Sequence, residues 1–227
     1  MSKLSIIVPV LNEGDGIAVA LDALADLRAL GTELIVVDGG SRDATIQQAT
    51  LRADQVVRAP RGRALQMNAG AEKASGDVLL FLHADTRLPA EADRVVLNGL
   101  DQSRRAWGRF DVKIDGRSPL LPVVAWLMGL RSRVTWIATG DQAIFVRREA
   151  FQAVGGFPAI ALMEDIAICK RLKRLGRPLC LRARVTTSGR RWEKNGVLST
   201  IFLMWRLRLA YFLGTDPKEL ARQYGYE

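Results

Sequence analysis

The feature that most constrains the fold of this sequence is a series of short apolar segments that alternate with helix-like segments through its first 100 residues. Four segments have the length and composition of strands: residues 4–10, 33–37, 55–58 and 77–82. The segments between them have the periodicity or composition of helices: residues 17–30, 41–51 and 63–75. Continuous apolar runs indicate strands buried on both faces. Their alternation with helices predicts an α/β fold with a mostly parallel, doubly wound sheet.

The pattern changes after residue 100, where the spacing of strands and helices is less regular. Strand-like segments lie at residues 107–114, 142–146 and 179–187, and helix-like segments at 120–130, 162–175 and 197–213. A chain of 227 residues is long enough for one large domain with a full core, but short for two. We therefore expect a single domain over residues 1–227, made of a first half (1–100), a second half (101–192) and a C-terminal helical segment (193–227).

The chain is strongly basic, with a formal net charge of +9 and a pI near 10.1. Such a charge attracts polyanions, which include nucleic acid, an anionic bilayer and a phosphorylated small substrate, and charge alone does not choose among them. The two cysteines have neither metal-ligand spacing nor a disulfide framework, which favours a reducing, cytoplasmic compartment.

Membrane insertion is not predicted. The N-terminus lacks the longer apolar stretch of a signal peptide, and no segment reaches the roughly 18 to 20 apolar residues of a spanning helix. Residues 197–213 come closest, but Arg206 and Arg208 interrupt them. This segment is typical of an amphipathic helix that packs on the core or lies on a bilayer surface. We expect a cytoplasmic protein, with peripheral contact at the inner face of the membrane left open.

Polar residues follow the predicted parallel strands, at the edge where such sheets bind ligands. Asn12 and Glu13 follow the first strand, Asp38 ends the second, and His83 and Asp85 follow the fourth. Carboxylates here are candidates for a divalent cation that neutralises a diphosphate. The alternatives are structural: Asp85 caps a turn, Asp38 caps a helix, and His83 is satisfied by neighbours.

Two further groups carry possible chemistry. Glu164 and Asp165 begin a helix, where carboxylates favour the helix dipole, but Asp165 is also a candidate general base for an acceptor hydroxyl. Residues 190–192, Arg-Arg-Trp in a predicted loop, suit diphosphate contacts and stacking. Arg63 begins a helix whose N-terminus adds to the same anion site.

In this order the motifs resemble those of family-two inverting glycosyltransferases, and the resemblance covers almost the whole chain. They are IVPVLNE (7–13), VVDGGSRDAT (36–45), NAG (68–70), LHAD (82–85), ED (164–165) and RRW (190–192). The resemblance implies a type-A glycosyltransferase fold, a nucleoside-diphosphate sugar donor, with uridine as the default base, and a manganese or magnesium ion.

The resemblance also implies a role for each matched position. Nucleotide-sugar contacts fall to Pro9, Asn12, Glu13, Asp38, Arg63, Asp85, Arg190, Arg191 and Trp192. The resemblance assigns the metal to Asp85, with His83 beside it. It assigns catalysis to Asp165, with Glu164 beside it. Donor sugar and acceptor face Arg109, Gly140, Asp141 and Gln142. The acceptor is a hydroxyl compound, soluble or lipid-linked, and no oligomeric state is predicted.

His83 departs from the family pattern, in which an aspartate occupies the first position of the Asp-X-Asp motif, so the metal has one carboxylate fewer. The His-Ala-Asp form, with WGRF (107–110) and SGRRWEK (188–194), is similar to a short bacterial subfamily associated with arsenosugar biosynthesis. Two alternatives stay open: a nucleotidyltransferase, and a basic RNA- or membrane-binding module. The first lacks a Gly-rich loop with a following Lys near the first strand. Nucleic acid is disfavoured because acidic strand ends repel a phosphate backbone.

Overall fold

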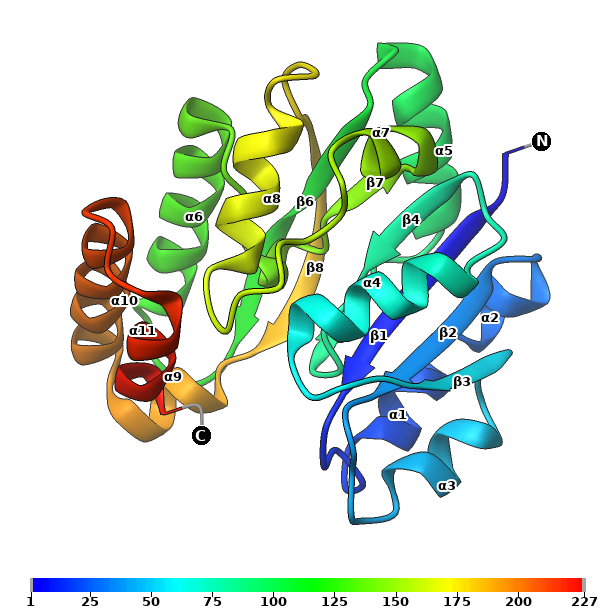
Figure 1. Ribbon diagram of the computed structural model, residues 1–227, viewed down its shortest axis with the longest axis horizontal. Coiled ribbons are helices and arrows are strands. Elements are labelled where there is room, and N and C mark those ends of the chain that lie inside the picture. The colour runs from blue at the N-terminus through cyan, green and yellow to red at the C-terminus, as the bar shows by residue number, and fades with distance from the viewer. Residues whose placement is uncertain (1, 226–227) are drawn as a thin grey trace.

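The computed structural model describes residues 2–225, and over this range the chain builds one eight-stranded sheet in the order β3-β2-β1-β4-β7-β6-β8-β5 (Figure 1). The strands are β1 (Leu4–Val10), β2 (Glu33–Asp38), β3 (Gln55–Arg58), β4 (Val78–Phe81), β5 (Thr86–Arg87), β6 (Trp107–Asp115), β7 (Phe145–Arg147) and β8 (Leu179–Ser188). β1 to β4 are mutually parallel and β6 is parallel to β8, whereas β7 runs antiparallel to β4 and β6, and β5 antiparallel to β8. The expected mostly parallel sheet is confirmed.

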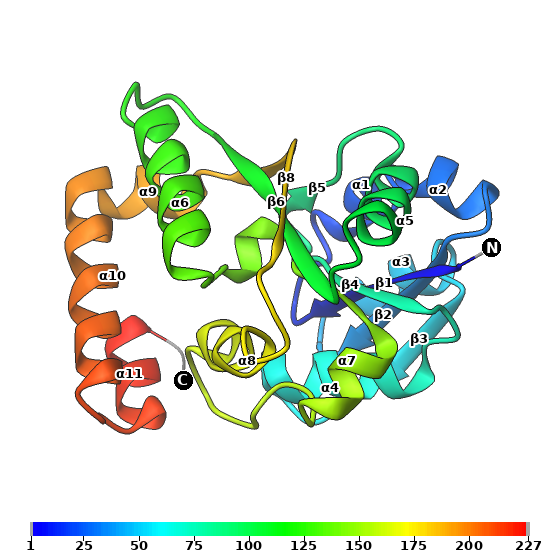
Figure 2. The ribbon, with the colours of Figure 1, turned by 90° about the horizontal axis from the view of Figure 1, so that it is seen from above.

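Helices cover both faces of the sheet (Figure 2). They are α1 (Ile17–Asp22), α2 (Ala25–Ala29), α3 (Thr45–Thr50), α4 (Arg63–Lys73), α5 (Ala92–Ser103), α6 (Leu121–Thr135), α7 (Arg148–Ala153), α8 (Glu164–Leu172), α9 (Arg190–Asn195), α10 (Val197–Phe212) and α11 (Pro217–Tyr224), with a 3-10 turn, η1, at Gly140–Gln142. One core packs α1, α2, α3, α5 and α6 on the sheet, and a second packs α4, α7 and α8 on the other face. This two-sided cover explains the apolar strand runs, because Ile6 and Ile7 point into different cores.

A third, smaller core joins the start of α8 to the C-terminal helices. Met163 and Ile166 pack against Leu207 of α10 and Leu220 of α11. Neither α10 nor any other helix in residues 2–225 is long and apolar enough to cross a membrane.

Several elements differ from the sequence-based expectation. The helix expected at 17–30 is two short helices, α1 and α2, and the one expected at 41–51 begins only at Thr45. The delay has a local cause, because the carboxylates of Asp38 and Asp43 accept backbone N–H groups of Ser41 and Thr45 and so stabilise a turn instead.

Two predictions in the second half were wrong. Residues 190–192 were expected in a loop but begin helix α9, and the strand expected at 142–146 begins at Phe145 because Gly140–Gln142 form η1. Helix α5 was not predicted, although its buried residues Val96 and Leu100 have helical spacing.

Candidate active site

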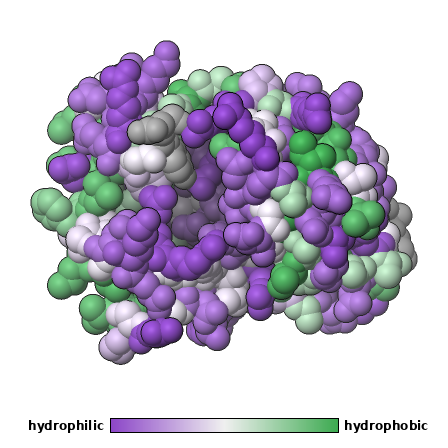
Figure 3. Space-filling view, turned by 90° about the horizontal axis from the view of Figure 1, so that it is seen from below, coloured by the Kyte–Doolittle hydropathy of each residue, from purple (hydrophilic) through white to green (hydrophobic). Residues whose placement is uncertain are grey.

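The strand order locates the site. β2 and β3 lie on one side of β1 and β4 lies on the other, so the strand order switches direction between β1 and β4. Open α/β sheets bind ligands at the carboxyl ends of the strands at such a switch point. Two adjoining cavities of about 730 and 490 Å³ lie there. Figure 3 views the molecule from this end and shows a hollow bordered by hydrophilic side chains. Both cavities are lined by Glu13, Arg63, His83 and Asp85, which therefore form their junction.

The smaller cavity lies against the end of β1 and the N-terminus of α4, and Pro9, Leu11, Arg61 and Gln66 line it. The buried Gln66 amide donates to the carbonyl oxygens of Val10 and Val37, both at 2.8 Å. This side chain therefore holds the ends of two neighbouring strands in register with α4 beside the cavity.

Asn12 and Asp38 serve the loops around this cavity. The Asp38 side chain is buried and accepts the backbone N–H groups of Gly40, at 2.9 Å, and Ser41. Asn12, at φ 53°, accepts the N–H of Arg42 at 2.9 Å through Oδ1. Neither residue lines either cavity, so the structure places both in loop architecture, and their expected nucleoside contacts stay predictions.

Opposite charges meet at the junction. Burial, followed by the negative charge of Asp85, raises the pKa of Glu13, while Arg190 and Arg63 act in the other direction. The two-residue strand β5 sets this geometry: Thr86 pairs with Thr187 of β8, and the Asp85 carbonyl accepts the Ser188 N–H at 3.2 Å. Asp85 is thereby brought beside the segment that carries Arg190.

A divalent cation fits this junction only with help from the substrate. Within residues 2–225 no three His, Cys, Asp or Glu side chains converge as a metal cluster. Asp85 is exposed to both cavities, and Mg²⁺ is commonly held by one or two carboxylates together with substrate phosphates. The donor set therefore suits a cation that arrives with a diphosphate.

His83 is engaged by η1. Its Nδ1 lies 3.3 Å from Oδ1 of Asp141, and a Cβ on Gly140 would approach its Nε2 to 2.3 Å. Burial acts to raise the pKa of Asp141, but the hydrogen bond and charge of His83, together with the charges of Arg63 and Arg208, lower it overall. The ring thus contacts Gly140 and Asp141, an arrangement typical of a positioning residue.

Asp165 lines the larger cavity from the start of α8. Its carboxylate accepts the Gly140 N–H at 3.1 Å and the Ile166 N–H at 2.7 Å, which fixes its orientation. Glu164 beside it is 6% exposed, and burial, then the charge of Asp165, raises its pKa to about 7. Two adjacent carboxyls with different environments are a common source of distinct acid and base roles.

The basic motif of α9, Arg190 to Trp192, borders the larger cavity. Arg191 and Trp192 line the larger cavity, and the Arg191 guanidinium stacks on the Tyr224 ring at 4.0 Å. Arg190 lines neither cavity, but its charge reaches Glu13.

Arg109 and Gln142 lie behind the cavity wall. Arg109 is 0% exposed, pairs with Asp111 and donates to the Gly129 carbonyl at 3.2 Å. Gln142 is also fully buried, and its amide donates to the Ser132 hydroxyl at 3.2 Å. The structure does not bring these two expected acceptor residues to either cavity.

Two cationic residues line the larger cavity without having been predicted as site residues: Arg131 of α6 and Arg208 of α10. A signal for both was present in the sequence, because Arg131 follows Leu127 by four residues and Arg208 follows Met204 by four, so each lies on the same helix face as an apolar cavity residue. A charge on the apolar face of a helix indicates a buried partner or ligand.

Comparison with known proteins gives the same class as the geometry. Residues 5–155 match the family model described as "Glycosyl transferase family 2". The chain belongs to this family, which confirms the family-level resemblance.

Curated relatives match over shorter stretches. The PGL/p-HBAD biosynthesis glycosyltransferase of Mycobacterium bovis is 38% identical over 96 residues, covering 39% of this chain and 37% of the relative. The undecaprenyl-phosphate 4-deoxy-4-formamido-L-arabinose transferase of Yersinia pestis is 29% identical over 102 residues, covering 40% and 31%. The chain thus spans well under half the length of these relatives.

Solved structures confirm the type-A glycosyltransferase fold. TarS from S. aureus in complex with UDP-GlcNAc has a TM-score of 0.67 at 21% identity, covering 82% of this chain and 58% of TarS. Mannosyltransferase PcManGT from Pyrobaculum calidifontis, in complex with GDP-Man and Mn²⁺, has a TM-score of 0.66 at 22% identity, covering 99% and 69%.

Proposed function

We propose that the protein transfers a sugar from a nucleoside-diphosphate donor, with UDP as the first candidate, to a hydroxyl acceptor with inversion. The observation that carries the proposal is the junction of the two cavities. Glu13, Arg63, His83 and Asp85 separate a chamber at the parallel strand ends from a chamber that contains Asp165. A donor that spans the junction puts its nucleoside in the smaller chamber and its sugar in the larger one.

Asp165 is the proposed base. The Gly140 and Ile166 N–H groups hold its carboxylate, so its free lone pairs can accept the proton of an acceptor hydroxyl in the larger chamber. The alkoxide that forms attacks the anomeric carbon from the face opposite the diphosphate, the bond to the diphosphate oxygen breaks, and the configuration inverts.

Negative charge develops on the leaving diphosphate, which this proposal places at the junction. Arg63 lines the junction, Arg191 lines the larger cavity, and Asp85 would hold a manganese or magnesium ion at the junction. When bound, the ion supplies positive charge that stabilises the departing diphosphate. His83, held by Asp141, positions η1 and thus Gly140, one of the two amides that orient Asp165.

The neighbours support the donor class and the ion. The TarS and PcManGT complexes contain UDP-GlcNAc, and GDP-Man with Mn²⁺. Three parts of the proposal rest on the motif resemblance. They are the contacts of Arg190, Arg191 and Trp192 to the diphosphate, the assignment of residues 1–100 to the donor and 101–192 to the acceptor, and the link to the arsenosugar-associated subfamily. A cytoplasmic location, with peripheral contact at the membrane, belongs to the same proposal.

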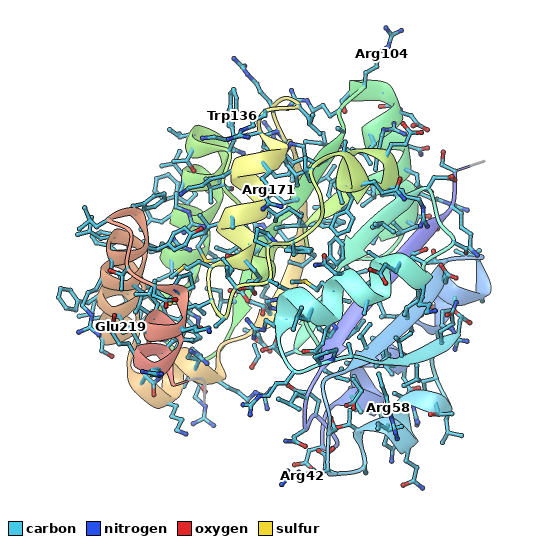
Figure 4. The ribbon with its side chains drawn as sticks, in the orientation of Figure 1. Arg42, Arg58, Arg104, Trp136, Arg171 and Glu219 are labelled. Atoms are coloured by element: carbon cyan, nitrogen blue, oxygen red, sulfur yellow. The ribbon has the colours of Figure 1, made fainter. Side chains whose placement is uncertain are left out.

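A thermal-shift screen of nucleoside diphosphates and their sugars, with and without Mn²⁺, tests the proposal. We expect one nucleotide to raise Tm, and to raise it further with Mn²⁺. A shift by nucleoside triphosphates with release of pyrophosphate would instead indicate a nucleotidyltransferase. Stabilisation by RNA alone, with a steep salt dependence, would contradict the proposal in favour of a basic binding module. Arg42 and Arg104 project from opposite ends of the molecule (Figure 4), so the basic side chains do not all lie on one face.

A further inference from the structure

Two arginines in the larger cavity have buried side-chain nitrogens without a protein partner. The Nε and Nη2 of Arg131 and the Nε of Arg208 are buried and make no hydrogen bond in the part of the chain that the structure describes. No ion pair within residues 2–225 includes either side chain. Buried charges are normally paired, so an unpaired pair of them indicates a missing anion.

The two side chains act on the same small volume. Burial and the neighbouring charge of Arg208 lower the pKa of Arg131 to about 10, which shows that these cations repel each other. The charges of Asp165 and Asp141 favour both cations, so the pair lies within electrostatic reach of the proposed base without contacting it directly. An anion held here would lie next to the reacting hydroxyl.

The position assigns this anion to the acceptor. Arg131 and Arg208 line the larger cavity only, whereas the residues at the junction line both. The donor diphosphate already has Arg63 and Asp85 at the junction. The arginines therefore lie away from the junction, in the chamber that contains Asp165.

The wall next to the arginines is apolar and opens outwards. Val124, Leu127 and Met128 of α6 face Ile201, Met204 and Trp205 of α10 across the cavity. Leu127 is 45% exposed and Trp205 67%, so the apolar wall continues to the surface. The two helices lie side by side (Figures 1 and 2) and carry further exposed apolar side chains: Val123, Trp126, Leu130, Leu198, Phe202, Leu209 and Phe212.

We propose that Arg131 and Arg208 form an acceptor subsite for a phosphate monoester on an apolar chain, with the chain leaving the cavity between α6 and α10. Two guanidinium forks match the charge and the oxygen geometry of a phosphate dianion better than those of a single carboxylate. The apolar wall accounts for the chain, because a free anion would gain nothing from Leu127 and Trp205. This inference rests on the proposed function and names its acceptor class.

The test measures binding of octyl phosphate, inorganic phosphate and octyl glucoside by tryptophan fluorescence, since Trp192 and Trp205 line the cavity. We expect octyl phosphate to bind at least tenfold more tightly than either other probe. Arg131→Gln and Arg208→Gln should each weaken octyl phosphate binding at least tenfold, and the control Arg206→Gln, on the exposed face of the same helix, should not. UDP affinity with Mn²⁺ should stay within about twofold in all three variants.

Each other result overturns the inference. Equal binding of octyl glucoside would show a neutral amphiphile site, and equal binding of inorganic phosphate a free-anion site. A parallel loss of UDP affinity would assign the arginines to the donor. If the variants bind octyl phosphate normally while the protein still binds UDP, the inference fails and the proposed function stands; if UDP does not bind the wild type, the proposed function fails.

A stability measurement separates a ligand site from a structural role. Removing an unpaired buried charge should leave Tm unchanged or raise it, because no native contact is lost. A lower Tm of Arg131→Gln and Arg208→Gln would show that the guanidiniums support the fold instead.

Discussion

The first half of the chain and the part after residue 100 build the walls of the candidate site differently. In the first half, side chains complete the loops: Gln66 joins two strand ends, and Asp38 closes the turn after β2. In the second half and the C-terminal segment, α6 and α10 carry many exposed apolar side chains and the arginines with buried, unpaired nitrogens. The donor side is thus complete within the chain, whereas the acceptor side has charge and apolar surface that a ligand would complete. This contrast predicts that mutations in the first half affect folding and nucleotide affinity, and those in the second half chemistry and acceptor binding.

The largest expected effect is on catalysis at Asp165. Asp165→Asn removes the basic carboxylate and keeps one acceptor oxygen, so it retains only one of the bonds from the Gly140 and Ile166 N–H groups, which go to different carboxylate oxygens. Transfer should fall by about 10²- to 10⁴-fold, the usual contribution of a general base, with UDP affinity unchanged. Steady-state kinetics and calorimetry measure the two effects, and normal turnover would reject Asp165 as the base.

Glu164 should make stability depend on pH. Its raised pKa means that the folded protein keeps a proton which the unfolded chain loses above about 4.5, so its contribution to stability is full below 4.5 and is lost as pH rises to about 7. Glu164→Gln lacks this loss, and should gain up to about 3 kcal/mol relative to wild type across that range. Urea unfolding from pH 4 to 8 measures the difference, and parallel curves for the two proteins would contradict the assignment.

In the first half the expected effect is on folding. Gln66→Ala leaves the carbonyls of Val10 and Val37 without their buried donor and should cost about 2 kcal/mol of unfolding free energy. Gln47→Ala, exposed on α3, is a matched control for the loss of a glutamine. If Gln66→Ala unfolds at the wild-type urea concentration, the first half does not depend on this link.

The smallest expected effect concerns the ion. Asp85→Ala should weaken UDP binding about tenfold, or about 1.4 kcal/mol, in the presence of Mn²⁺ and hardly at all in its absence. Asp26→Ala, exposed on α2, supplies the matched carboxylate loss away from the site. An Mn²⁺-dependent affinity that survives in Asp85→Ala would place the ion elsewhere.

The same contrast explains what the sequence could predict. β1 and β3 begin and end at the expected residues, because apolar runs between polar turns leave little choice of boundary. The motif positions Glu13, Arg63, Asp85 and Asp165 all line the cavities, since strand and helix ends fix where their side chains emerge.

The rest depended on contacts between distant segments. Arg109 and Gln142 stand in promising motifs but are buried by α6, which no local pattern reveals. Arg131 and Arg208 are 77 residues apart in sequence and share a cavity only because α10 packs beside α6. The Asp38 carboxylate accepts backbone N–H groups of its own loop. Whether a carboxylate binds its own loop or faces a ligand depends on the backbone angles.

The short ladder between β5 and β8 has a consequence for binding. It makes Asp85 and the segment leading into α9 and α10 one mechanical unit, through the Asp85–Ser188 hydrogen bond and the pairing of Thr86 with Thr187. A compound that shifts α10 would therefore also shift Asp85, and the affinities of the two substrates should be thermodynamically linked. Linkage is reciprocal, so UDP with Mn²⁺ should change octyl phosphate affinity by the same factor that octyl phosphate changes UDP affinity. Paired titrations that give independent affinities would show instead that the ladder transmits nothing, and that the two chambers fill without cooperativity.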